Sequence, residues 1–133
     1  MKYLLDTNTC IFVIKKKPQS VVRRLRSEKP EDVGISSVTV AELEFGVSKS
    51  QYPDRNRIAL LQFLLPFGVL DFDQNAARHY GQIRAALEAA GTPIGPLDTL
   101  IGSQARAYGL VLVTNNRREF GRIEGLTVED WLL

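Results

Sequence analysis

The sequence contains very few residues of the types that form cross-links or bind zinc. Among its 133 residues, Cys10 is the only cysteine and His79 the only histidine. A lone cysteine excludes an intrachain disulfide, and these two side chains are too few for a zinc site built from cysteine or histidine. A chain of this length buries about two-thirds of the surface of its unfolded form. We therefore expect a hydrophobic core to stabilise the fold without such cross-links.

Long hydrophobic runs are also absent. The stretch from Ile58 to Phe67 is interrupted by Gln62 and Pro66, and it is shorter than the ~20 residues that cross a bilayer. Near the N-terminus, Asp6 comes too early for the apolar core of a signal peptide. The sequence thus predicts a cytoplasmic protein with no membrane segment.

The charge is nearly balanced overall but is unevenly distributed. The 17 Lys+Arg and 15 Asp+Glu residues give a net charge of +2, and basic residues dominate the first 29 positions. Such an excess can face a polyanion such as RNA, although a solvated helix surface explains it as well. The candidate RNA-binding residues are Lys15, Lys16, Lys17, Arg23, Arg24 and Arg26, together with Arg117 and Arg118 further along the chain.

Apolar segments alternate with amphipathic segments of helical length along the whole chain. This order predicts one α/β domain, residues 1–133, with a central, mostly parallel twisted sheet flanked by helices. The expected strands are Lys2 to Leu5, Val33 to Ile35, Val69 to Phe72, Leu110 to Val113 and Leu126 to Val128. The expected helices are Thr9 to Lys16, Gln19 to Arg26, Val38 to Ser50, Arg55 to Leu65, Gln74 to Ala90 and Leu97 to Tyr108.

Several helix boundaries carry recognisable signals. Ser36 or Ser37 can cap the third helix, and Asp54 and Asp73 are better explained as N-caps than as catalytic groups. Pro96 occupies a position typical of the first residue of a helix.

Acidic residues occur where strands of the predicted sheet end or where the adjoining helices begin. Asp6 directly follows the first strand and Glu42 lies early in the helix after the second; Asp98 and Glu119 flank the fourth strand along the chain. Ligands of open parallel sheets bind beyond the carboxyl ends of the strands. We therefore expect these side chains to meet at one edge of the sheet.

Each of these acids could have a simpler role as a cap or a surface ion pair, but their convergence would need a cation. Two carboxylates ~4 Å apart repel by roughly 4 kcal/mol at an effective dielectric of 20. With only oxygen ligands available, the expected ion is Mg²⁺ or Mn²⁺ held by Asp6, Asp98 and Glu42. Such a site has no protein nucleophile, and its natural chemistry is attack of metal-activated water on a phosphodiester.

Neutral polar residues accompany the acids and are expected to orient the carboxylates or to hold water. Each could equally be a cap or a turn residue. These residues are Thr7, Asn8, Ser37, Thr114 and Asn116.

The acidic segments together resemble a known family. The segments are Leu4-Leu5-Asp6-Thr7-Asn8, Ile35-Ser36-Ser37-Val38-Thr39-Val40-Ala41-Glu42-Leu43, Gly95-Pro96-Leu97-Asp98 and Val113-Thr114-Asn115-Asn116-Arg117-Arg118-Glu119-Phe120. In this order they are similar to PIN-domain ribonucleases, and most closely to the VapC-type toxins of bacterial toxin–antitoxin pairs. The resemblance extends over essentially the whole chain.

The resemblance implies a PIN-like fold, a homodimer, inhibition by a small VapB-type antitoxin, and RNA cleavage that depends on Mg²⁺ or Mn²⁺. Asp6, Glu42 and Asp98 match the three core acids of the family. Many members have an aspartate at the position of Asn116, and Glu119, about one helical turn later, is expected to supply that charge. The most similar subgroup implies cleavage of initiator tRNA in the anticodon region, with mRNA as the alternative.

Two interpretations from other classes remain open. Leu5-Asp6-Thr7-Asn8 also resembles the nucleophilic strand end of haloacid-dehalogenase-like phosphatases, although Asn8 stands where those enzymes usually carry a second aspartate. The other alternative is a non-catalytic acidic pocket on a binding module.

Overall fold

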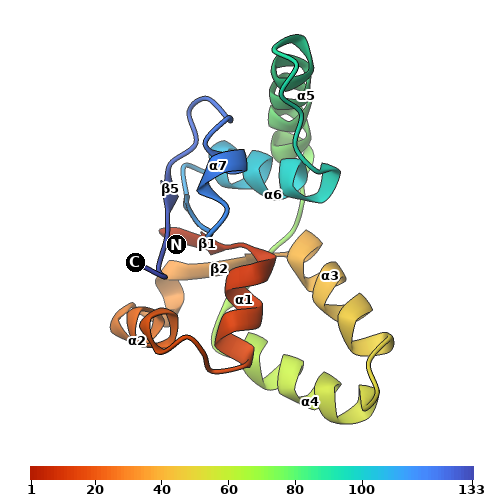
Figure 1. The fold of residues 1–133 in the computed structure, drawn as a ribbon, viewed down its shortest axis with the longest axis vertical. Helices are drawn as coiled ribbons and strands as arrows, with labels where there is room; N and C mark the ends of the chain where they lie inside the picture. The colour runs from red at the N-terminus through yellow and green to blue at the C-terminus, as the bar shows by residue number, and fades with distance from the viewer.

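A computed structural model describes residues 1–133 and contains a five-stranded parallel sheet (Figure 1). The strand order is β3-β2-β1-β4-β5, and all four neighbouring pairs are parallel. The strands are β1 (Tyr3–Leu5), β2 (Val33–Ser36), β3 (Gly68–Leu70), β4 (Val111–Val113) and β5 (Val128–Glu129). The predicted α/β class and parallel sheet are confirmed.

All six predicted helices are present, and a short seventh follows β4. The helices are α1 (Thr7–Ile14), α2 (Gln19–Ser27), α3 (Ser37–Ser48), α4 (Pro53–Leu64), α5 (Gln74–Ala89), α6 (Pro96–Ala107) and α7 (Arg117–Phe120). A single 3₁₀ turn, Pro30–Asp32, precedes β2. No helix combines the length and the apolar character that a bilayer crossing would require.

Some predicted boundaries were wrong. The first helix begins two residues earlier than predicted because Asp6 caps it. Asp54 is not an N-cap: Tyr52 occupies the cap position of α4, and Pro53 takes the first helical position, which its fixed φ suits. The last strand begins at Val128, after a turn at Gly125, whose φ is +83°.

The two faces of the sheet are covered by different helices (Figure 1). Leu5 and Val113 point into a cluster with side chains of α1 to α4, whereas Leu4 and Leu112 point into a cluster with α5, α6 and Phe120 of α7. Successive strand residues point to opposite faces, so the central strands β1 and β4 are covered on both sides and consist of apolar and aromatic residues throughout.

The strand order also locates a point where the chain changes direction. From the central strand β1 the chain builds outward through β2 and β3, and it then returns to add β4 and β5 on the other side. In sheets of this kind, ligands bind in the crevice at the carboxyl ends of the strands on either side of that point. Here that crevice lies between β1 and β4.

Candidate active site

Asp6 lies at this crevice and is almost fully buried. The register pairs Leu5 with Val113, so Asp6 and Thr114 extend from neighbouring strands at the same level. The Asp6 carboxylate accepts a 2.8 Å hydrogen bond from the Thr9 backbone N–H and caps α1. Only 3% of Asp6 is exposed. Burial is the main cause of a raised Asp6 pKa, which a hydrogen bond with the Thr114 side chain partly offsets.

Thr114 also shapes the turn after β4. Its hydroxyl accepts a 2.9 Å hydrogen bond from the Asn116 backbone N–H. The Asn116 side-chain amide in turn donates to a Glu119 carboxylate oxygen at 3.2 Å. One short polar chain thus connects the buried Asp6 to the half-exposed Glu119.

Glu42 is held from the neighbouring helix. The Thr7 hydroxyl, in the first turn of α1, donates to the Glu42 carboxylate at 2.7 Å and lies 3.3 Å from the Thr39 hydroxyl. Thr39 is fully buried. A hydroxyl pair between α1 and α3 therefore fixes the Glu42 carboxylate beside the end of β1.

Asp98 is the residue at which the four acids meet electrostatically. It lies in the first turn of α6, as predicted. Partial burial raises the pKa of Asp98, and the negative charges of Asp6, Glu42 and Glu119 add to this effect. Together they bring the pKa to about 6. The structure therefore brings together the four acids singled out in the sequence. No group of three of these carboxylates surrounds a single point at metal-ligand distance.

Two of the polar residues expected beside the acids do not contact them. Asn8 is exposed and makes no hydrogen bond through its side chain. The Ser37 hydroxyl accepts a 3.2 Å hydrogen bond from the Phe72 N–H instead, and so ties α3 to the segment after β3. Thr9 and Thr39 could not be identified from the sequence, because each has the pattern of an ordinary helix residue. Only the fold places them beside the acids or their partners.

The predicted basic residues fall into separate groups. Lys15, Lys16 and Lys17 are exposed at the end of α1 opposite to Asp6.

Arg24, in contrast, forms ion pairs within the protein: it lies 3.1 Å from Glu28 and 2.9 Å from Glu129. Its guanidinium group is therefore shared by two acids of the protein itself. The other four basic residues are exposed, Arg23 and Arg26 on α2 and Arg117 and Arg118 at the start of α7.

The stability of the metal-free protein is expected to depend on pH through Asp98. An aspartate in an unfolded chain titrates near pH 4, whereas the folded pKa of Asp98 is about 6. The folded state therefore binds this proton more tightly, and the free energy of unfolding falls as the pH rises through that interval. We expect Asp98→Asn to raise the free energy of unfolding in EDTA at neutral pH, by on the order of 1–2 kcal/mol after allowance for solvent screening.

Denaturant titrations in EDTA at about pH 4.5 and about pH 7.5 would measure this effect. Asp54→Asn is a matched control, since Asp54 is an exposed aspartate in the first turn of another proline-initiated helix. It should lose the small stabilisation that a negative charge gains from the helix dipole. Equal responses of the two variants would mean that the other acids do not act on Asp98.

Comparisons with known proteins agree with this fold and identify its family. The PIN domain family model matches residues 3–126. The chain is 50% identical over 131 residues to the tRNA(fMet)-specific endonuclease VapC of Shigella flexneri, covering 98% of both chains. It is 42% identical over 132 residues to ribonuclease VapC2 of Haemophilus influenzae, covering 99% of both.

Solved structures give the same result. A DNA-bound VapBC complex from Salmonella typhimurium contains a chain that is 49% identical, with a TM-score of 0.94 over 98% of both chains. VapBC-1 from nontypeable Haemophilus influenzae aligns over both full chains at 32% identity and a TM-score of 0.91. The chain therefore belongs to the VapC ribonucleases of the PIN-domain family.

Proposed function

We propose that this protein is a divalent-metal-dependent endoribonuclease that cuts initiator tRNA in the anticodon region and is restrained by a small antitoxin. The observation that carries the proposal is the convergence of Asp6, Glu42 and Glu119 on Asp98, whose pKa all three raise. The relatives named tRNA(fMet)-specific endonuclease support the choice of substrate. Inhibition by an antitoxin is supported by the similar chains found in VapBC complexes.

The side chains at this edge suit Mg²⁺ or Mn²⁺. All the candidate ligands are carboxylates, whereas Cys10 lies in the hydrophobic core and His79 accepts a hydrogen bond from Arg106. Hard divalent cations prefer oxygen ligands and keep several waters. We propose Asp6, Glu42 and Asp98 as the ligands, with Glu119 completing the acidic edge. When bound, such an ion activates water for attack on phosphorus and neutralises charge on the departing oxygen.

The protein's own contribution is to hold the acids in place. Asp6 is fixed by the Thr9 N–H, and Glu42 is fixed by the Thr7 hydroxyl. Both carboxylates therefore keep their orientation when substrate arrives, which is the positioning that a catalytic site needs. The exposed guanidinium groups of Arg117 and Arg118 lie just after the β4 turn. We propose that they attract the phosphates that the acidic edge itself repels.

Helices α3 and α4 offer a surface for a protein partner. Large apolar side chains are exposed on them, with exposed fractions of 65% for Phe45, 58% for Ile58, 56% for Leu61 and 86% for Leu65. Exposed apolar groups gathered on adjoining elements are typical of interaction sites. We propose that a VapB-type antitoxin binds to this surface. We also propose that the protein forms the homodimer implied by its family. A measurement of its mass in solution would detect this dimer.

Cleavage of initiator tRNA by the purified protein tests the proposal directly. We expect cleavage in Mg²⁺ or Mn²⁺, none in EDTA, and little cleavage of an elongator tRNA or an mRNA fragment. Mn²⁺ alone should also raise the thermal melting temperature of the wild-type protein but not that of Asp98→Asn. Cleavage that persists in EDTA would contradict the metal site. A metal-dependent melting shift without any cleavage would favour a binding module.

The fourth acidic position can be resolved by exchanging charges. Glu119 accepts a hydrogen bond from the Asn116 amide, so the double variant Asn116→Asp/Glu119→Gln moves the charge while retaining one donor and one acceptor. We expect Glu119→Gln to reduce the cleavage rate more than Asn116→Ala does, and the double variant to recover part of the loss. Full activity of Glu119→Gln would place this residue outside the site.

The phosphatase alternative does not fit this sequence. The second aspartate that those phosphatases usually carry two residues after the nucleophile is replaced here by Asn8. The Asn8 side chain is exposed to solvent. The match to the PIN domain family agrees with this conclusion.

A further inference from the structure

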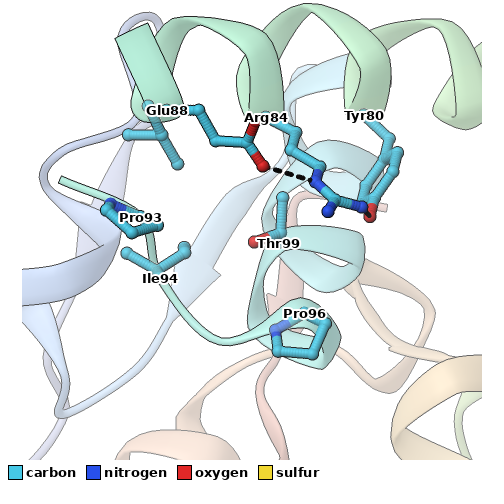
Figure 2. A pocket seen from close by; sticks show the side chains of 8 residues that line it. Tyr80, Arg84, Glu88, Pro93, Ile94, Pro96 and Thr99 are labelled. Carbon is cyan, nitrogen blue, oxygen red and sulfur yellow. Dashed lines mark hydrogen bonds and ion pairs between the residues drawn. The ribbon is translucent and has the colours of Figure 1, made fainter. Parts of the chain in front are cut away.

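A cavity of about 220 Å³ opens beside the acidic edge, between α5 and the start of α6. Figure 2 shows Arg84 between Glu88 and Tyr80 on α5, with Thr99 and Pro96 of α6 below them. Thr99 directly follows Asp98 in the chain, and Pro96 begins the same helical turn. The first turn of α6 therefore lines this cavity and also carries Asp98 of the acidic site. None of the residues placed in the acidic site lines it.

The lining combines an aromatic ring, a planar cation and an apolar floor. Arg84 donates to Glu88 at 3.0 Å and to the Tyr80 hydroxyl at 3.0 Å, which fixes the guanidinium plane at the mouth of the cavity. These bonds use two of its five N–H groups. Leu87 and Ile94 supply apolar side chains. Ordering a long side chain costs conformational entropy, and these two bonds order Arg84 before any ligand binds.

The size and chemistry of the cavity fit one planar heterocycle. Its volume is below the roughly 300 Å³ at which pockets for drug-sized ligands begin. Unpaired RNA bases are commonly held by stacking on tyrosine rings or arginine planes, with hydrogen bonds to their edges. Thr99 donates its hydroxyl hydrogen to the Gly95 carbonyl, so its oxygen can still accept. Arg84 still has N–H groups that can donate.

We propose that this cavity is a subsite for one unstacked nucleobase of the RNA, next to the phosphate that is cut. The inference rests on the proposed ribonuclease function, and it adds to it the groups that position the substrate. Tyr80 and Arg84 act as positioning residues that hold a base adjacent to the scissile bond. An RNA loop presents such bases, whereas a duplex keeps them paired.

The test is a thermodynamic cycle between the cavity and the RNA. Binding of an anticodon-loop RNA is measured in EDTA, with each nucleotide near the cut site replaced in turn by an abasic ribose. For the wild-type protein, one abasic position should lower affinity about 10-fold, as loss of one stacked base does. Tyr80→Leu, which keeps bulk but removes the ring, should lose the same factor and show no further loss with that abasic RNA. Tyr80→Phe should bind nearly as well as the wild type.

A matched control exists elsewhere on the surface. Tyr52 also lies beside an arginine, with Arg55 over its ring at 5.0 Å, but it does not line this cavity. Tyr52→Leu should leave RNA affinity and the abasic profile unchanged. The subsite would be overturned if the loss of RNA affinity in Tyr80→Leu simply added to the loss at every abasic position. It would also be overturned if Tyr80→Leu and Tyr52→Leu lost the same affinity. A phosphate in the cavity would overturn it too, and would appear as a changed salt dependence in Arg84→Gln without any abasic effect.

A cleavage assay separates this inference from the proposed function. In Mg²⁺ we expect Tyr80→Leu to raise KM for loop RNA about 10-fold, with a smaller change in kcat. If the wild-type protein cleaves RNA and Tyr80→Leu has the same KM, the subsite is overturned but the ribonuclease proposal is not. Absence of cleavage by the wild-type protein would instead contradict the ribonuclease proposal.

Discussion

Replacing Asp6 by asparagine is expected to lower the RNA cleavage rate by at least about 100-fold while leaving the protein folded. The change removes one negative charge from the proposed metal ligands. It keeps the atom that accepts the 2.8 Å hydrogen bond from the Thr9 N–H, and asparagine caps helices about as well as aspartate. The reduced repulsion on Asp98 should also keep the metal-free protein at least as stable as the wild type. Single-turnover cleavage and thermal melts measure the two effects.

Asp73→Asn provides a control with the same local geometry. Asp73 caps α5 through a 2.9 Å hydrogen bond from the Ala76 N–H. It is exposed and does not act on the pKa of Asp98. Asp73→Asn should therefore cleave RNA at the wild-type rate. If both cap substitutions reduced cleavage equally, loss of helix capping would explain the result. If neither did, Asp6 would not be a ligand.

The parts of the site that could be predicted from the sequence follow from local rules. Strands buried on both faces are continuously apolar, so a charged residue at the end of one, such as Asp6, stands out. Asp98 follows a proline that signals a helix start, and so its place in the first turn could be read directly. These signals lie within a few residues of the acids themselves.

The parts that could not be predicted depend on contacts between distant segments. Thr7 contacts Glu42, which is 35 residues further along the chain, and the Thr9 hydroxyl donates to the Val113 carbonyl, 104 residues away. Nothing local distinguishes Ser37, which bonds Phe72, from Thr39, which lies beside Thr7. The ion pair of Arg24 with Glu129 likewise depends on the last strand, β5, lying near α2. Pairing of this kind belongs to the tertiary fold.

Neutralising Arg117 and Arg118 is expected to weaken RNA binding strongly, and the structure gives this effect a dependence on RNA length. Both residues follow the β4 turn next to Asn116, so even a tetranucleotide at the acidic edge can reach them. Lys15, Lys16 and Lys17 lie beyond the other end of the eight-residue α1, about 12 Å from Asp6 at 1.5 Å per residue. A tetranucleotide has only three internucleotide phosphates, so those held at the acidic edge by the arginines leave few for the lysines, whereas a longer RNA can contact both groups.

The double variant Arg117→Gln/Arg118→Gln should therefore flatten the slope of log affinity against log salt by ~1.4 for a tetranucleotide and for whole tRNA alike. The triple variant Lys15→Gln/Lys16→Gln/Lys17→Gln should flatten it by ~2 for tRNA and leave the tetranucleotide unaffected. The site of cleavage should stay the same in both variants, because phosphate contacts position RNA without reading its bases. An unchanged slope for tRNA in the triple variant would make the lysines a solvated helix end. The attraction for phosphate would then come from the arginines beside the acids.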